Sequence, residues 1–342
     1  MSEPASPSPL LRPGVLLRAA AQLGLGIGLF AALVWWVSPS WEEIEGRIDI
    51  HVGWLLFGLT GSAMATVVGA ARWKLLSETM GATELPYGVY FHYMAMTRLV
   101  SQVLPNLLVD LVGRGTALKH AGSDSKLGQL IAPVVPERLL DLLLPLTLFG
   151  WAVAIHIAKL PWDPWWSLAA VSVLFAALSV PLLRPAVRIA LRLYGELRRL
   201  RKRDRSLPLP PMPQVGIGMS ARIVLYSIVR YIGLLIQYWG SGAGFGVWLS
   251  ALVLVSAVPL AQLAGLVGLT PGGLGVVEGG WVASLRQLGQ DEATIVVYIA
   301  AARLMMSVNF GILTLCSWPW RRVRAQPNAD SRLDASSPDA GE

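Results

Sequence analysis

Cysteine, histidine and charged residues are all scarce in this chain of 342 residues. Its single cysteine, Cys316, excludes a disulfide bond within the chain. The four histidines are scattered without metal-ligand spacing, so we expect no metal and no cofactor: His51, His92, His120 and His156. Charged residues make up 14% of the chain, and no nucleotide-binding motif is present.

Apolar residues are abundant instead. They make up 54% of the chain, and the mean hydropathy is +0.55, which is more than a soluble domain of this size needs for its core. The formal net charge of +7 could suggest nucleic acid, but the basic residues cluster beside apolar stretches. Membrane topology and anionic lipid headgroups place them there. The composition therefore predicts an all-α polytopic integral membrane protein that does not bind nucleic acid.

Eight apolar stretches have about the 20 residues that cross the hydrocarbon core of a bilayer. They are 16–37, 52–71, 87–109, 139–157, 164–183, 219–239, 246–268 and 293–316. Four groups of basic residues mark the side that we expect to face the cytoplasm. These anchors are Arg12 with Arg18, Arg72 with Lys74, the run from Arg184 to Arg205, and Arg321, Arg322 and Arg324.

The parity of the crossings predicts two re-entrant hairpins. Three apolar stretches separate the second basic anchor from the third, and three more separate the third from the fourth. Because an odd number of crossings would leave one anchor outside, one stretch in each interval must enter and return. Proline and polar residues interrupt 87–112 and 246–288. We therefore expect six to eight membrane helices with two hairpins entering from opposite sides, as in an inverted repeat.

An alternative for the second hairpin is that 274–288 makes a short crossing, although about 15 helical residues reach only about 22 Å. The expected organisation has five parts. These are a disordered cytoplasmic tail (1–15), a first membrane half (16–183), a basic interfacial helix with a proline-rich linker (184–218), a second membrane half (219–320) and a disordered cytoplasmic tail (321–342).

The segment from Thr270 to Trp281 places proline, glycines and a carboxylate directly after an apolar run. At membrane depth such backbone is tolerated only against protein or a wet cavity. The glycines either expose N–H groups to an anion such as a phosphate headgroup or form a tight hairpin without a ligand. A buried carboxylate must be protonated or paired, so Glu278 either contacts substrate or a proton or forms a salt bridge.

Two further groups of charged residues lie within apolar stretches. Glu137 and Asp141 share a helix face, with Arg138 on the adjacent face. This trio is either an interhelical clamp, to Arg98 or Arg303, or a contact for a lipid headgroup. Arg303 would cost about 2.5–3.5 kcal/mol on insertion scales near the centre of a membrane helix. We expect it to pair with Glu278 or to bind a lipid phosphate.

Three of these elements resemble the lysylphosphatidylglycerol synthase transmembrane family, which is flippase-like. The segment 271–278 matches a PGGxGxxE motif, 137–143 matches ERxxDLL, and 104–114 resembles a looser LPxxxGE…R element with valine in place of the glycine. The candidate substrate-binding residues are Pro271, Gly272, Gly273, Gly275, Glu278, Arg303, Glu137, Arg138, Asp141, Arg98, Asn106, Asp110 and Arg114.

The resemblance implies a lipid translocase, similar to a flippase or scramblase. The basic segments predict that it resides in the bacterial inner membrane with both termini cytoplasmic. Its substrate would be a phospholipid or a polyprenyl- or hopanoid-type lipid, and its partners membrane lipids with anionic headgroups. Two alternatives remain: an intramembrane lipid-modifying transferase that uses Glu137 and Asp141, and an accessory subunit of a separately encoded envelope-lipid or glycolipid synthase. The family's soluble synthase domain has no counterpart, because 184–218 is too short for such a fold.

Overall fold

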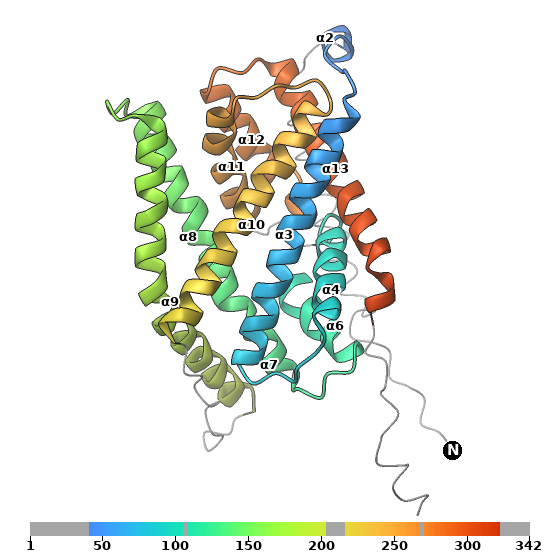
Figure 1. Ribbon diagram of the computed structural model, residues 1–342, viewed down its shortest axis with the longest axis vertical. Coiled ribbons are helices and arrows are strands. Elements are labelled where there is room, and N and C mark those ends of the chain that lie inside the picture. The colour runs from blue at the N-terminus through green and yellow to red at the C-terminus, as the bar shows by residue number, and fades with distance from the viewer. Residues whose placement is uncertain (1–40, 105–108, 203–215, 267–269, 322–342) are drawn as a thin grey trace, which may run out of the picture.

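The computed structural model describes residues 41–104, 109–202, 216–266 and 270–321, and the regular structure in these ranges is helical (Figure 1). Five helical segments there are long and apolar enough to cross a membrane: Val52–Thr79, Leu127–Ile157, Pro164–Ile189, Ile217–Ala243 and Glu292–Cys316. They confirm the predicted all-α polytopic membrane fold. The expected first span at 16–37 lies outside the described residues, as do 1–15 and all of the expected C-terminal tail except Arg321.

The described helices follow one another along the chain. In order they are α2 (Trp41–Glu45), α3 (Val52–Thr79), α4 (Tyr87–Val100), the π-helical turn η2 (Val109–Gly113), α6 (Arg114–His120), α7 (Leu127–Ile131), α8 (Val134–Ala152) with the π-helical turn η3 (Val153–Ile157), α9 (Pro164–Lys202), α10 (Ile217–Ala243), α11 (Ala251–Leu266), the 3-10 turn η4 (Pro271–Gly273), α12 (Val276–Gln287), α13 (Glu292–Cys316) and the 3-10 turn η5 (Trp318–Trp320).

The first hairpin consists of α4 and the returning limb η2–α6. The backbone N–H of Thr83 donates to Ser125 Oγ over 2.6 Å, so the chain before α4 and the chain after α6 lie at the same end of the bundle. Figure 1 shows the two limbs beside the lower part of α3, at this end of the bundle. The returning limb continues as helix to His120, and the hairpin therefore extends beyond the boundary at residue 112 that the sequence indicated.

The second hairpin consists of α11 and α12 and enters from the opposite end of the bundle (Figure 1). The connection between α2 and α3 contacts the chain at both ends of this hairpin. The His51 N–H donates to the Gly244 carbonyl over 2.9 Å, and Arg47 Nη1 lies 3.1 Å from Asp291 Oδ2. The twelve residues of α12 span about 18 Å, well short of the roughly 30 Å of hydrocarbon. The structure therefore has a returning hairpin here and not the alternative short crossing.

The tips of the two hairpins meet inside the bundle, where the Gly272 N–H donates to the Leu104 carbonyl over 3.2 Å. The first hairpin packs through α4 against α13, and the second packs through α11 against α8. The first hairpin thus lies against α13 of the second half of the chain, and the second lies against α8 of the first half. Figure 1 also shows α3 and α10 side by side and running in opposite directions. The contact of each hairpin with the opposite half, together with the antiparallel pair α3 and α10, is the arrangement expected of an inverted repeat.

Close backbone contact joins α3 to α10 at the centre of the molecule. A Cβ atom at Gly61 would lie 2.5 Å from the backbone nitrogen of Gln237 and 2.6 Å from the carbonyl oxygen of Gly233. Gly240 packs in the same way against the backbone of Gly58. Small residues let membrane helices approach this closely, because lipid tails offer no hydrophobic drive for association and dispersion contacts must supply it.

We expect Gly61→Ala to lower the free energy of unfolding by about 1–3 kcal/mol, the usual cost of overpacking. Gly150→Ala is the matched control, because a Cβ there meets no atom within 4 Å. The control should be neutral or stabilise the helix by up to about 1 kcal/mol. Thermal unfolding of both purified variants in the same detergent would measure the difference, and equal midpoints would contradict the close packing.

The helix α9 corrects one expected boundary. The basic segment that begins at residue 184 is not a separate interfacial helix but continues the membrane helix α9 to Lys202. Pro181 and Pro185 lie inside α9, and Figure 1 shows the lower part of α9 set at an angle to the upper part. Proline bends a membrane helix without ending it where neighbouring groups satisfy the freed carbonyls. The remainder of the expected linker, 203–215, lies outside the described residues.

Candidate functional site

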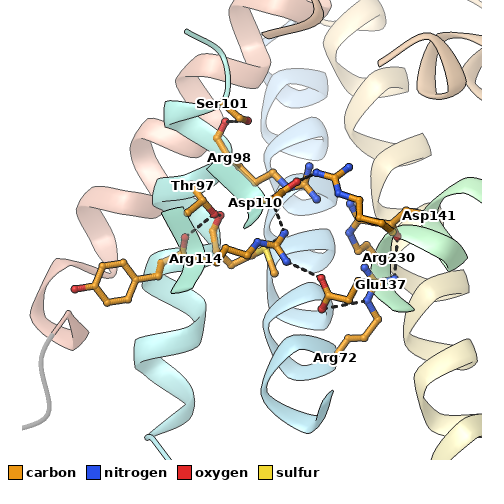
Figure 2. A network of polar contacts seen from close by, with 12 residues as sticks. Arg72, Thr97, Arg98, Ser101, Asp110, Arg114, Glu137, Asp141 and Arg230 are labelled. Atoms are coloured by element: carbon orange, nitrogen blue, oxygen red, sulfur yellow. Dashed lines mark hydrogen bonds and ion pairs between the residues drawn. The ribbon is translucent and has the colours of Figure 1, made fainter. Parts of the chain in front are cut away.

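Asp141 on α8 binds two arginines that come from different helices. Its Oδ1 atom lies 2.9 Å from Arg72 Nη1 on α3 and 2.8 Å from Arg230 Nη1 on α10. Arg72 Nη1 also donates to Ser227 Oγ over 2.9 Å. Figure 2 shows these side chains converging on α8. The carboxylate therefore joins α3 in the first half of the chain to α10 in the second half.

Glu137, one turn before Asp141, extends the network to the first hairpin. Its Oε2 atom accepts a hydrogen bond from Arg114 Nη1 over 2.5 Å, and its Oε1 atom lies 3.7 Å from Arg72 Nε. Arg114 Nη2 in turn lies 3.0 Å from Asp110 Oδ1, and Arg138 pairs with Asp110 as well. Glu137 and Arg114 are 1% and 2% exposed, so these are fully buried ion pairs.

These partners differ from the expected ones. The clamp on Glu137 and Asp141 does not use Arg98 or Arg303; it uses Arg72, Arg114 and Arg230. Arg72 also differs from a membrane-edge anchor, because its side chain is 1% exposed and points into the bundle. A basic residue near a helix end fits the positive-inside pattern, but that pattern does not specify which way the side chain turns.

Glu278 and Arg303 form a second buried ion pair at the tip of the second hairpin. Glu278 Oε1 accepts from Arg303 Nε over 2.5 Å, and Glu278 Oε2 accepts from the Gly275 N–H over 2.8 Å. Arg303 Nη1 donates to the Gly272 carbonyl over 2.8 Å. Of the two alternatives for Glu278, the structure shows the salt bridge. The carboxylate caps α12 and fixes the position of Arg303.

The glycines of this turn have a structural role. Gly272 and Gly275 adopt φ angles of +60° and +78°, which L side chains rarely take. The N–H groups of Gly272, Gly273 and Gly275 donate to Leu104, Thr270 and Glu278 respectively. These donors are therefore satisfied within the protein. Of the two alternatives, the structure shows the tight hairpin and not a row of N–H groups turned toward an anion.

The two hairpins carry equivalent ion pairs. In each hairpin the returning limb supplies a carboxylate, Asp110 in the first and Glu278 in the second. Each carboxylate binds an arginine on the next long helix, Arg138 on α8 and Arg303 on α13. Asp110 lies in the π-helical turn η2, a type of turn that is frequent at functional sites.

A cavity of about 120 Å³ lies between the hairpin tips, large enough for several water-sized groups. Both hairpins and the long helices α3, α8, α10 and α13 contribute to its wall. Four guanidinium groups line it, and no carboxylate is among the described residues that do so. The arginines are Arg98, Arg138, Arg230 and Arg303; the uncharged polar residues are Thr66, Ser101, Gln102, Gln237, Tyr238 and Gln262.

Positive charge exceeds negative charge in this part of the described chain. Arg98 forms no ion pair with any described residue, and its side chain is partly buried. An uncompensated charge at such depth is costly. Six arginines face four carboxylates, which leaves an excess of two positive charges: Arg72, Arg98, Arg114, Arg138, Arg230 and Arg303 against Asp110, Glu137, Asp141 and Glu278. The arrangement is suited to hold an anion.

The candidate residues from the sequence fall into three groups. Those that line the cavity are Arg98, Arg138, Gly272 and Arg303. Asp141 borders an adjoining cavity of about 40 Å³. Neither cavity is lined by Asp110, Arg114, Glu137, Gly273, Gly275 or Glu278, although Asp110 and Glu278 bind the lining arginines Arg138 and Arg303. Pro271 begins the turn η4, and Asn106 lies outside the described residues.

The sequence reasoning missed Arg72, Arg230 and Gln237. Arg230 had a usable signal, because it lies midway along the 27-residue apolar helix α10, where a charge is expensive. Gln237 had a weaker signal of the same kind. Among the residues that the structure describes, no group of three or more histidine, cysteine, aspartate or glutamate side chains could hold a metal ion.

Comparison with known proteins identifies the family of this chain. No curated protein and no solved structure matches it. A family model, described as the lysylphosphatidylglycerol synthase TM region, matches residues 22–313 and so contains both hairpins and the cavity. This family suggests a role that involves membrane lipids. With its apolar helices and this match, the chain is a multi-pass membrane protein that belongs to the lysylphosphatidylglycerol synthase TM region family.

Proposed function

We propose that the protein is a lipid translocase that moves a lipid with an anionic phosphate headgroup between the leaflets of the bacterial inner membrane. The observation that carries this proposal is the cavity between the hairpin tips, with its four guanidinium groups and no lining carboxylate. Guanidinium groups match phosphate oxygens in geometry as well as in charge. A phosphate there would offset the excess positive charge of the surrounding residues.

The position of the cavity supports transport rather than simple binding. It lies where two half-length hairpins from opposite ends of the bundle meet. Transporters built from inverted repeats bind substrate at such a junction near the middle of the membrane. Moving a headgroup through hydrocarbon is unfavourable because its polar groups lose their hydration. A polar cavity halfway across lowers that cost while the acyl chains stay in lipid.

The orientation follows from the basic residues. The end of α3 contacts the start of α10, because Thr79 Oγ1 donates to Met219 Sδ over 3.2 Å, and Gly88 at the start of α4 packs against Trp320. The basic run from Arg184 to Arg205 begins within the lower part of α9, at this same end in Figure 1. By the positive-inside rule this end faces the cytoplasm, with both termini on that side. The first hairpin then enters from the cytoplasm.

The ion pairs argue against the transferase alternative. Glu137 and Asp141 would have to act as nucleophile or base, yet each contacts two guanidinium groups. Such pairing engages the carboxylate oxygens that a nucleophile or a general base would have to present to a substrate. A role as an accessory subunit would not explain the arginine-lined cavity, so we rank it second to translocation.

We expect Glu278→Gln to lower the rate of lipid movement at least tenfold. The substitution removes the charge that positions Arg303 at the cavity and leaves a buried guanidinium uncompensated, at a cost of about 3–5 kcal/mol. The measurement is the transbilayer movement of labelled phosphatidylglycerol in proteoliposomes with equal amounts of reconstituted protein. A double variant, Glu278→Gln with Arg303→Gln, should recover stability but not movement.

Glu292→Gln provides the matched control. It breaks the pair between Glu292 and Arg286, whose geometry is similar but whose side chains are 38% and 37% exposed. This control should retain wild-type movement, because exposed pairs contribute about 0–1 kcal/mol. Unchanged movement in Glu278→Gln would refute the role of the pair. If the wild-type protein moves no lipid, translocation itself is wrong, and a co-purifying synthase or a mass change of added lipid should be sought.

A further inference from the structure

The polar side chains that line the cavity belong to two chemical classes. We call the four arginines the cationic wall and the uncharged polar residues named above the neutral wall; the latter come from α3, α10, α11 and the two residues that follow α4. The neutral wall is not needed to hold a phosphate, because the guanidinium groups already supply the donors. Its side chains match a different part of a ligand.

Gln237 is the residue of the neutral wall whose amide lacks hydrogen-bond partners among the described residues. Its side chain lines the cavity and is 0% exposed, and neither its amide nitrogen nor its amide oxygen has a hydrogen-bond partner among the described residues. Buried polar groups are almost always hydrogen-bonded, so both a donor and an acceptor at this position call for a partner. The backbone of Gln237 is held in place by the close contact with Gly61, so the point from which its side chain projects is fixed.

A neighbouring amide extends this surface. Gln262 Nε2 on α11 donates to Tyr238 Oη over 3.1 Å, and both residues line the same cavity. Thr66 on α3 also lines the cavity; its hydroxyl donates to the Ser62 carbonyl over 2.7 Å and can still accept a hydrogen bond. Amides and hydroxyls both donate and accept, so together they complement the hydroxyl groups of a polyol or a sugar.

We propose that this neutral wall is a subsite for an uncharged, hydroxyl-bearing group attached to the lipid phosphate, such as glycerol or a sugar, and that it selects against headgroups with an amine. An ammonium group has only donors and needs a carboxylate or another acceptor-rich partner. No carboxylate lines the cavity in the described chain, and both oxygens of the nearby Glu278 are occupied. The four guanidinium groups would also repel a second positive charge. This inference rests on the proposed translocase function.

The test compares three lipids that share a phosphate. Phosphatidylglycerol has a polyol, phosphatidic acid has the phosphate alone, and phosphatidylethanolamine has an amine. In proteoliposomes, the wild-type protein should move phosphatidylglycerol at least tenfold faster than phosphatidylethanolamine. Gln237→Met keeps the length of the side chain and removes both polar atoms. It should slow phosphatidylglycerol at least threefold and change phosphatidic acid by less than twofold.

Thermal stability distinguishes the subsite from a merely structural role. If Gln237 were structural, Gln237→Met would lower the thermal midpoint. Because Gln237→Met removes a buried amide without a partner, the thermal midpoint of the variant should be unchanged or higher. In detergent, short-chain phosphatidylglycerol should raise the midpoint of the wild-type protein more than it raises that of Gln237→Met. Gln262→Met offers a second variant on a different helix with the same expected selectivity.

The outcomes separate the two proposals. Equal movement of phosphatidylglycerol and phosphatidylethanolamine by the wild-type protein would overturn the subsite and leave translocation standing. Equal slowing of phosphatidylglycerol and phosphatidic acid in both variants would also overturn the subsite. If no lipid moves, translocation fails; the binding measurement then still decides the subsite, which is overturned if the three short-chain lipids shift the midpoint equally.

Discussion

Replacing Arg98 by glutamine is expected to reduce lipid movement at least tenfold while leaving the protein as stable as the wild type. Arg98 lines the cavity but forms no ion pair with any described residue. The structure therefore loses no salt bridge when the charge is removed, and it loses one of the two charges in excess. A phosphate in the cavity would lose a charged donor, and charge-assisted hydrogen bonds are about twice as strong as neutral ones.

The measurement combines transport in proteoliposomes with thermal unfolding of the same preparations. Arg222→Gln is the matched control, because it removes an arginine from the exposed surface of α10. That control should leave both readings unchanged. Wild-type movement in Arg98→Gln would show that the guanidinium does not contact the lipid. A large fall in its thermal midpoint would show instead that Arg98 has a structural partner.

Glu137→Gln should have the opposite profile, with a loss of about 3–5 kcal/mol in the free energy of unfolding. Glu137 is 1% exposed and lies between Arg114 and Arg72. Its loss leaves two buried guanidinium groups with one carboxylate partner each: Arg114 keeps Asp110, and Arg72 keeps Asp141. The excess of positive charge around the cavity would rise from two to three. Breaking such a pair costs more than the pair contributes, because the remaining charge stays buried.

Thermal or denaturant unfolding in detergent would measure this effect. Glu84→Gln is the control, since Glu84 is exposed in the connection before α4, and its replacement should change stability by less than about 0.5 kcal/mol. A second variant that combines Glu137→Gln with Arg114→Met should recover part of the loss, because it returns the excess of positive charge from three to two. If Glu137→Gln and Glu84→Gln unfold alike, the network is not a structural clamp.

The two hairpins show how far a linear pattern can predict a membrane fold. Basic anchors and the number of apolar stretches between them required one returning segment in each half, and the structure has a hairpin at each of these places. The limits of the prediction lie at boundaries. The first hairpin continues to His120, and α9 continues past residue 184, because helix formation does not stop where hydropathy falls.

The sequence by itself determined the class of protein, most of its membrane helices and the segments that carry charge at depth. These properties depend on composition and on spacing along one helix, and both can be counted in a linear chain. The tertiary structure decided which charges are neutralised and which face the cavity. Arg72, Arg98 and Arg230 look alike as single basic residues near or within apolar stretches. Arg72 and Arg230 bind Asp141, whereas Arg98 lines the cavity without an ion pair to any described residue. That choice depends on how each helix is rotated about its axis and on which helices become neighbours, and long-range packing alone fixes both.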